Sequence, residues 1–369
     1  MWIFLFVSSL GLLIFFHELG HFLAAKRAGV FVEEFGFGYP PRIIGVYKEN
    51  SKLKLIFGPK KKKTENTIYS LNLLPFGGFV KLYGENKNLG DKSFFSAKLS
   101  KRLQISSAGI IFNFFLGILL LSFGYLIGVP RAGNSPYILN PQIQIIGVSK
   151  NSPAQKAELQ IGDVILGVKE KNSFLEFKTI KEFQNYIQHQ KGKEIVLKIK
   201  RKGKEKYLSV FARKSPPEGE GAIGIVLAKV GKFKPPFHLA IPYAIIDSFK
   251  IAGTIFVSIY FILKSLIIKK MLIADVAGPI GIVYFGSKFT QLGISYLLWF
   301  LSLLSINLAV INLLPIPAAD GGRILILLIE KIRKKRVSQK VENLINSLGF
   351  ILIIILMILI TFKDIQRFF

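Results

Sequence analysis

The chain opens with MWIFLFVSSLGLLIFFHELGHFLAAKR, residues 1–27, an apolar stretch that ends in basic residues. Its only formally charged side chain before Lys26 is Glu18, which stands next to His17. A secretory signal peptide would carry its positive charge ahead of the apolar stretch. We therefore interpret residues 1–25 as a retained transmembrane helix whose C-terminal end faces the cytoplasm, where basic residues are enriched.

The rest of the sequence contains further apolar blocks. Of the 369 residues, 51% are hydrophobic, and many of them stand in blocks long enough to cross a bilayer. We predict additional spans over residues 103–129, 294–320 and 344–361, the second of which is interrupted by Pro315 and Pro317. The blocks predict a polytopic α-helical membrane protein with about four transmembrane helices.

The net charge of the chain is +28. Its basic residues lie in loops beside apolar blocks, and no nucleic-acid-binding motif accompanies them. Anionic lipid head groups supply a suitable counter-charge. The composition therefore favours contacts with membrane lipids and argues against a nucleic-acid partner. The absence of cysteine excludes disulfides and thiolate metal sites.

Residues 31–102 form a basic loop within an N-terminal membrane part, residues 1–129. In Phe31–Ile44 and Ile68–Leu82, apolar residues alternate and are interrupted by Gly and Pro, which is typical of β-hairpins. A second basic connector, Glu330–Lys340, separates the last two spans. Short basic loops mark the cytoplasmic side of a membrane, so we place both loops inside the cell.

Residues 130–235 differ from the flanking sequence because they are polar. Short β-like runs such as Ile195–Ile199 are separated by Gly and charged turns. We predict a soluble, β-rich domain inserted between two membrane parts. The positions of the basic loops place this domain outside the cytoplasm. Its own positive charge is compatible with that position, because long domains are translocated largely regardless of charge.

The C-terminal membrane part, residues 236–369, begins with an ambiguous segment, residues 239–268. This segment is apolar but contains one acidic and two basic residues. A further crossing here would bring Asp320 to the outer face, away from the histidines at the inner end of the first helix. We therefore predict that residues 239–268 form an interfacial helix that lies along the membrane surface.

The first predicted span carries the pattern H-E-x-x-H at His17-Glu18-Leu19-Gly20-His21. Positions i and i+4 lie on one face of an α-helix, so both imidazoles can bind one zinc ion. Zinc lowers the pKa of a water that it binds towards ~7, and a neighbouring glutamate can take the proton as the water attacks a carbonyl. The pattern predicts a zinc-dependent hydrolase with Glu18 as general base.

A chance occurrence of this pattern is the alternative. The chain contains four histidines, and two of them fall within these five residues. Ionisable groups inside a membrane span are costly and usually functional. Both observations favour a metal site.

A catalytic zinc site usually has a third protein ligand. The metzincin pattern would place a histidine at position 27, where this chain has arginine, and that class is therefore excluded. Glu33 and Glu34 are candidates by analogy with thermolysin-like enzymes, although nothing in the sequence holds them against the first helix. Asp320 is the other candidate, because it follows the double-proline break of a span; an aspartate there can equally be the N-cap of the next helix.

Together, these residues resemble the site-2 protease family of intramembrane metalloproteases, in particular its bacterial branch that cleaves anti-sigma factors. The resemblance covers essentially the whole chain. His17, Glu18 and His21 match the family's zinc motif, and Asn312 to Asp320 with the two following glycines match its second motif. The resemblance implies that Asp320 is the third ligand of Zn²⁺ and that Asn312 contacts the substrate or stabilises the transition state.

Two further segments resemble signatures of that family. Leu71–Glu85 (LNLLPFGGFVKLYGE) looks like a membrane-associated β-hairpin that holds the substrate in extended form. It implies a substrate-positioning role for Gly77, Gly78 and Phe79. Val276–Ile282 (VAGPIGI) looks like another signature, ahead of the third span. The chain departs from the family at Ile110, where the family usually has proline after the glycine of the second span.

The soluble domain resembles a PDZ module. Asn151-Ser-Pro-Ala154, followed by Leu159-Gln-Ile-Gly162-Asp163-Val-Ile165, is the kind of run found in PDZ domains of bacterial proteases. Such a domain can bind an extended chain end as an added strand. It can equally act as a filter that keeps large substrates away from the site, and both roles stay open.

These observations predict a zinc-dependent intramembrane endopeptidase that cleaves other membrane proteins, such as anti-sigma-factor-like substrates, in or near their transmembrane segments. The resemblance implies a multi-pass protein of a bacterial inner (plasma) membrane, with the active site towards the cytoplasm and the PDZ-like domain outside. One alternative is an inert scaffold that works through its PDZ-like domain, but the motif is intact and includes its base. A zinc transporter would need ligands along a path across the membrane, and the sequence places them near one face.

Overall fold

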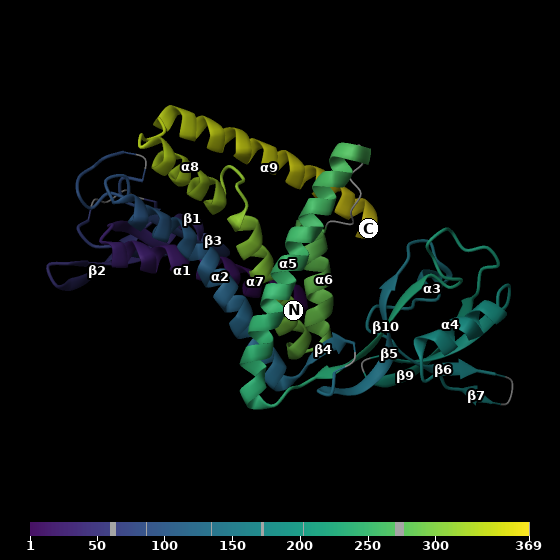
Figure 1. Ribbon diagram of the computed structural model, residues 1–369. Helices are drawn as coiled ribbons and strands as arrows, with labels where there is room; N and C mark the ends of the chain where they lie inside the picture. Colours follow the sequence, from purple (N-terminus) through teal and green to yellow (C-terminus); the bar gives the residue numbers. More distant parts are fainter. Residues whose placement is uncertain are drawn as a thin grey trace. The chain divides into compact units, whose positions relative to one another are not determined.

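A computed structural model describes residues 1–59, 64–85, 87–133, 135–170, 173–201, 203–269 and 277–368 (Figure 1). The chain folds into two compact units. The first unit consists of Met1–Phe123 together with Ile241–Phe369, and the second unit is Gly124–Ala240. The second unit contains the whole segment 130–235 that is predicted to form the soluble domain.

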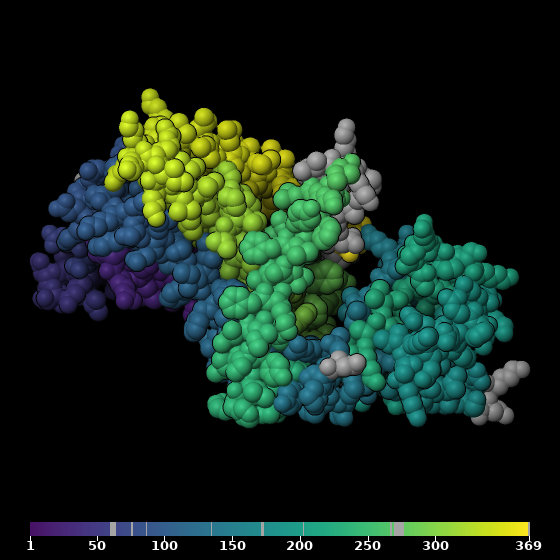
Figure 2. Space-filling model, viewed as in Figure 1, coloured from purple at the N-terminus to yellow at the C-terminus, as the bar shows by residue number. Residues whose placement is uncertain are grey.

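Five of the described helices are long and apolar enough to cross a membrane. They are α1 (Trp2–Ala28), α2 (Leu99–Ile127), α5 (Phe237–Lys269), α7 (Ile294–Leu313) and α9 (Gln339–Phe368). The predicted spans overlap α1, α2, α7 and α9, although the third, residues 294–320, continues beyond the end of α7 to the first residue of α8. Many of their apolar side chains face outward, as on α9, which lies at the surface in Figure 2 and leaves Leu352 66% exposed. Such an apolar outer surface fits a lipid environment.

The fifth of these helices, α5, contains the segment predicted to lie along the membrane surface. In Figure 1 it runs across the direction of α2 and α9. Its Ala252 packs in one apolar cluster with Ile306 and Val310 of α7. The predicted count of four spans is not confirmed, and the surface position of residues 239–268 stays a prediction.

Two shorter helices of the first unit are α6 (Pro279–Leu292) and α8 (Asp320–Arg333). α6 packs against α1, where Gly286 leaves room for the ring of Phe6. At the start of α6, the backbone N–H of Gly281 donates a hydrogen bond of 2.7 Å to the carboxylate of Asp364 on α9. In the predicted signature 276–282, position 276 lies outside the described residues, and the remainder leads into α6.

A sheet of order β2-β1-β3 belongs to the same unit. Its strands are β1 (Val32–Glu49), β2 (Lys52–Phe57) and β3 (Ile68–Leu82). The two segments predicted as β-hairpins pair with each other, with Phe37 opposite Gly78 and Gly36 opposite Phe79. β1 forms its hairpin with β2, which lies outside the two segments predicted as β-hairpins.

The second unit is built around a sheet of order β4-β10-β5-β6-β8-β9, with β7 paired to β6. Its strands are β4 (Val129–Ala132), β5 (Ile138–Val148), β6 (Val164–Lys169), β7 (Phe174–Leu175), β8 (Glu194–Arg201), β9 (Lys204–Phe211) and β10 (Ile225–Phe233), and its helices are α3 (Pro153–Lys156) and α4 (Ile180–His189). Phe183 and Ile187 of α4 share a buried apolar core with Leu197 and Ile199 of β8. This unit therefore has a core of its own, as an independent domain requires.

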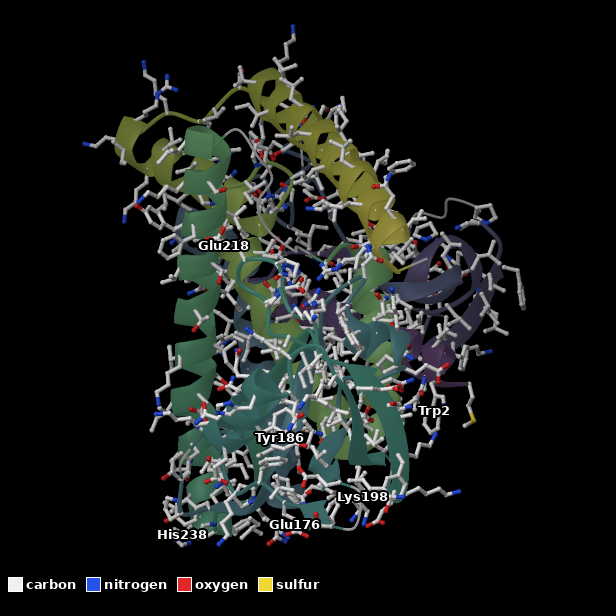
Figure 3. All side chains as sticks on the ribbon, turned by 90° about the vertical axis from the view of Figure 1, so that its right-hand side faces the viewer. Trp2, Glu176, Tyr186, Lys198, Glu218 and His238 are labelled. Atoms are coloured by element: carbon white, nitrogen blue, oxygen red, sulfur yellow. The ribbon has the colours of Figure 1, made fainter. Side chains whose placement is uncertain are left out.

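Polar side chains of the second unit pair around this core. Asp163, from the PDZ-like run, is 1% exposed, and its carboxylate accepts hydrogen bonds of 2.6 and 2.7 Å from Arg201. At the surface, the hydroxyl of Tyr186 donates to Glu170 at 3.1 Å, and the ammonium of Lys198 on β8 lies 2.8 Å from the carboxylate of Glu205. Figure 3 labels Tyr186 and Lys198. The buried pair is the one expected to matter for the stability of this unit, because exposed pairs contribute little.

Candidate metal centre

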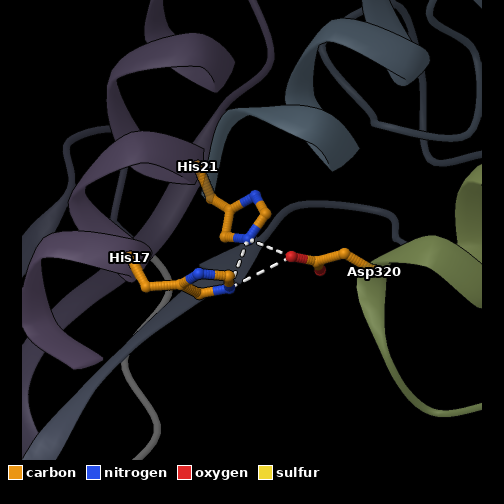
Figure 4. A group of neighbouring side chains, drawn as sticks. All are labelled: His17, His21 and Asp320. Atoms are coloured by element: carbon orange, nitrogen blue, oxygen red, sulfur yellow. Dashed lines mark hydrogen bonds and ion pairs between the residues drawn. The ribbon is translucent and has the colours of Figure 1, made fainter. Parts of the chain in front are cut away.

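Three side chains from distant segments of the chain converge in the first unit (Figure 4). His17 and His21 lie one turn apart on α1, and Asp320 is the first residue of α8. Oδ2 of Asp320 lies 3.0 Å from Nε2 of His17 and 3.2 Å from Nε2 of His21, and the two Nε2 atoms are 3.2 Å apart. The structure thus brings the two motif histidines together with the aspartate candidate for the third ligand.

Asp320 is positioned by the proline-broken segment that follows α7. The N-cap of α8 is Ala319, so Asp320 is not the N-cap that the sequence analysis leaves open. A Cβ on Gly321 would overlap the carbonyl groups of Leu313 and Leu314. Glycine therefore lets the first turn of α8 pack closely on the end of α7. In this arrangement the carboxylate of Asp320 points towards α1 (Figure 4).

The three donor atoms suit zinc in type and in spacing. Imidazole nitrogen and carboxylate oxygen are both zinc ligands, and the ligand atoms of one tetrahedral zinc lie about 3.3 Å apart. Both imidazoles are buried, and Oδ2 of Asp320 is a buried atom that completes no hydrogen bond within the described residues. A bound cation would satisfy such an oxygen. The residues fit a divalent metal ion, and three protein ligands leave a coordination position open for chemistry.

The ring of His21 is held from behind by α2. Its Nδ1 lies 2.7 Å from the backbone carbonyl oxygen of Ile105. Because a carbonyl can only accept, Nδ1 carries the proton and donates it, which leaves the lone pair on Nε2. A histidine that donates through one ring nitrogen and offers the other is the usual arrangement of a metal ligand.

The same helix closes one side of the centre at Gly109. A Cβ at this position would overlap Nε2 of both His17 and His21. Any side chain here would occupy the space in which the donor atoms converge. The centre therefore requires glycine at position 109, and nothing in the sequence pattern indicates this role.

Glu18 stands between the two histidines in sequence and beside β3 in space. Its carboxylate lies close to the backbone N–H of Val80. The two histidines and Asp320 are near enough to interact with it electrostatically. The candidate base therefore lies close to β3, and the H-E-x-x-H pattern alone does not reveal this neighbour.

The predicted substrate-positioning residues are Gly77, Gly78 and Phe79, on β3. The two glycines lie against Ile14 and Phe15 of α1, which come shortly before His17. Phe79 pairs with Gly36 of β1. The structure thus places this segment next to the helix that carries the metal candidates.

Among the described residues, the remaining candidates form no hydrogen bond or ion pair with His17, His21 or Asp320. Asn312 is the penultimate residue of α7, and its side chain forms no hydrogen bond with the described residues. The carboxylate of Glu33 is 2.5 Å from the ammonium of Lys81. Glu34 accepts hydrogen bonds of 2.6 and 2.8 Å from Arg42. The alternative third ligands, Glu33 and Glu34, are therefore engaged within the sheet and do not join the centre.

Comparisons with known proteins agree over the length of the chain. Peptidase family M50 matches residues 5–356. A putative zinc metalloprotease of Clostridium perfringens is 33% identical over 366 residues, which cover 99% of this chain and 98% of that protein. The regulator of sigma-W protease RasP of Bacillus subtilis is 26% identical, with 99% of this chain and 98% of that protein covered.

A solved structure gives a weaker likeness. The PDZ domain of an SdrC-like protein of Listeria innocua is 26% identical and covers 23% of this chain and 92% of that domain. The TM-score is 0.20, which is too low to establish a shared fold.

Proposed function

The chain belongs to peptidase family M50 and is a zinc metalloprotease of the multi-pass membrane type, and we propose that it hydrolyses peptide bonds in or beside the transmembrane segments of other membrane proteins. The observation that carries this proposal is the convergence of His17, His21 and Asp320 on one point. Two of these residues lie on α1, which is itself a candidate span. A substrate therefore has to reach the site from within the membrane.

In this proposal, His17, His21 and Asp320 hold the zinc ion and Glu18 is the general base. Zinc, when bound, polarises the substrate carbonyl and lowers the pKa of the attacking water. Glu18 takes a proton from that water and passes it to the leaving amine. Asn312, at the end of α7, contacts the substrate and stabilises the charge that develops on its carbonyl oxygen.

The substrate has to be extended in order to react, because a helix hides its carbonyl groups in its own hydrogen bonds. β3 is an outer strand of its sheet and carries Gly77, Gly78 and Phe79 beside α1. We assign to this segment the role of holding the substrate as an added strand. The closeness of Val80, on the same strand, to Glu18 supports this role. Substrates with helix-weakening residues near the cleaved bond are therefore favoured.

The second unit is assigned the role of a PDZ-like module. β4 pairs with Val230–Phe233 of β10, so among the described strands nothing pairs with the outer edge of residues 225–229. α4 packs near β10. An extended chain end can add to such an edge beside a helix. A unit that only keeps large substrates away would not need this free edge, so the edge favours peptide binding.

The substrate class is inferred from a relative. The similar protein of Bacillus subtilis is named as a regulator of sigma-W protease. We propose that this chain cleaves an anti-sigma-factor-like protein in a bacterial inner membrane, with the zinc site towards the cytoplasm and the second unit outside. An inert scaffold would have no use for a base between two buried histidines. A transporter would need ligands beyond the one group of potential ligands found among the described residues.

Co-expression with a tagged single-span reporter, whose outer domain has been trimmed, tests the proposal. Wild type should cleave the reporter, whereas Glu18→Gln and Asp320→Ala should not. Asp91→Ala, which removes an exposed carboxylate from the same unit, is the matched control and should cleave like wild type. Equal cleavage by wild type and Glu18→Gln would contradict the assigned chemistry.

A further inference from the structure

One more side chain faces the metal centre without a role in the proposal above. Asn113 of α2 is 1% exposed, and Nδ2 of its amide lies 3.2 Å from Nδ1 of His17. Its Oδ1 is buried and has no hydrogen-bond partner among the described residues. A buried amide oxygen without a donor is costly and calls for an explanation.

The chemistry of His17 supplies that explanation. Its Nε2 faces Asp320 and His21, so Nε2 has to offer a lone pair if it binds a cation. The neutral ring then carries its proton on Nδ1, which needs an acceptor. With Nδ2 of Asn113 facing Nδ1 of His17, two donors would meet and neither would have an acceptor. Rotating the amide group by 180° exchanges Oδ1 and Nδ2 without changing the shape of the side chain. Oδ1 then faces the ring and accepts a hydrogen bond from Nδ1–H of His17.

We propose that Asn113 is a positioning residue that accepts a hydrogen bond from Nδ1–H of His17 and so holds the ring and its tautomer ready for zinc. The arrangement parallels that of His21, whose Nδ1 donates to the carbonyl of Ile105. Ile105, Gly109 and Asn113 follow one another at intervals of four along α2, and therefore share one face. That face supplies an acceptor for each histidine and, at Gly109, the space between them.

α7 holds Asn113 in place. The hydroxyl of Ser305, which is fully buried, donates a hydrogen bond of 2.7 Å to the backbone carbonyl of Asn113. The backbone of α2 is thus fixed to α7 at the height of the metal centre. The segment after α7 leads to Asp320, so the same contact ties the positioning residue to the helix that precedes the third ligand.

Zinc affinity of the purified chain in detergent, measured by competition with a chelator, tests this inference. Asn113→Leu removes the acceptor and should weaken binding by about 10–100-fold, the usual effect of losing an outer-shell partner. Asn113→Asp keeps an acceptor and should bind zinc at least as tightly as wild type. Ser122→Ala is the matched control, because Ser122 is a buried polar residue of the same helix whose hydroxyl donates within its own turn, to the carbonyl of Ile118. It should match wild type.

The inference rests on the zinc ligands proposed above, so His21→Ala belongs to the same series. If His21→Ala binds zinc like wild type, the proposed ligands and this inference both fail. If His21→Ala loses zinc but Asn113→Leu keeps wild-type affinity, only the inference fails. Circular dichroism reports whether each variant keeps its helices. Should Asn113→Leu unfold, Asn113→Asp decides, since weakened zinc binding in a folded Asn113→Asp protein would overturn the inference.

Discussion

Nε2 of His17 lies 3.0 Å from Oδ2 of Asp320, although the two residues stand near opposite ends of the chain. α1 and α8 must therefore be docked before three ligands can act on one ion. Because a ligand that binds only the folded state stabilises it, metal binding should in turn favour the docked arrangement.

Removing the carboxylate of Asp320 should separate metal binding from folding. Asp320→Asn keeps the size of the side chain but loses the anionic ligand, so the loss of zinc should exceed the roughly 10–100-fold typical of an outer-shell change. Zinc content after gel filtration with a chelator measures this loss. Asp91→Asn, at an exposed position, should keep its zinc. Full zinc occupancy in Asp320→Asn would exclude this residue as a ligand.

A single methyl group should block the metal centre. In Gly109→Ala the new Cβ would overlap Nε2 of both histidines, so we expect little zinc and little cleavage. Gly253→Ala is the control, because a Cβ at this position of α5 meets no atom within 4 Å. An alanine there should be neutral or stabilise the helix by about 1 kcal/mol. Wild-type zinc content in Gly109→Ala would show that α2 does not close the site.

A buried ion pair should hold α8 against α2. The guanidinium of Arg102 lies 2.8 Å from the carboxylate of Glu330, and both residues are buried. Arg102→Met leaves the buried carboxylate of Glu330 without its counter-charge, which should cost about 3–5 kcal/mol. Among the described residues, the carboxylate keeps only the hydrogen bond that the backbone N–H of Val337 donates to it. The double variant Arg102→Met/Glu330→Leu leaves no charge behind and should recover most of that loss.

Thermal unfolding of these variants in detergent gives the comparison. Lys54→Met breaks the exposed pair with Glu49 and should cost less than about 1 kcal/mol. If the double variant melts as low as Arg102→Met, an uncompensated charge is not the cause of the loss.

Cysteine labelling can decide whether α5 lies along the membrane surface. The chain has no cysteine, so every introduced thiol is unique. Lys250, Thr254 and Ser258 follow one another at intervals of four and are exposed, which places a polar stripe on one face of the helix. At an interface, cysteines at all three positions should react with a membrane-impermeant reagent applied from outside. In a spanning helix, positions 254 and 258 should be protected.

Sequence reasoning predicts those parts of the metal centre that depend on a short segment of the chain. The i and i+4 spacing of His17 and His21 needs only a helix, which the apolar block supplies. The approach of Asp320 follows from a broken span whose two prolines are visible in the sequence. Sequence alone leaves Asp320 and the pair Glu33 and Glu34 open as third ligands. In the structure Asp320 lies beside the two histidines, whereas Glu33 pairs with Lys81 and Glu34 with Arg42.

Long-range packing accounts for what sequence reasoning leaves out. The two segments predicted as separate β-hairpins form strands that pair with each other, β1 with β3. Alternating apolar residues indicate a strand but do not indicate its partner. Likewise, the roles of Gly109 and Asn113 depend on which face of α2 meets α1. An apolar span shows no such face in its own pattern, since lipid and protein contacts are both apolar.

Cleavage of a single-span peptide by the purified chain in lipid vesicles is the most direct test of the central claim. Mass spectrometry of the products locates the cut, and zinc analysis is carried out on the same samples. We predict that wild type cuts within or beside the apolar segment, and that Glu18→Gln keeps its zinc but yields no product. A Glu18→Gln protein that cuts the same bond at the wild-type rate would contradict the account.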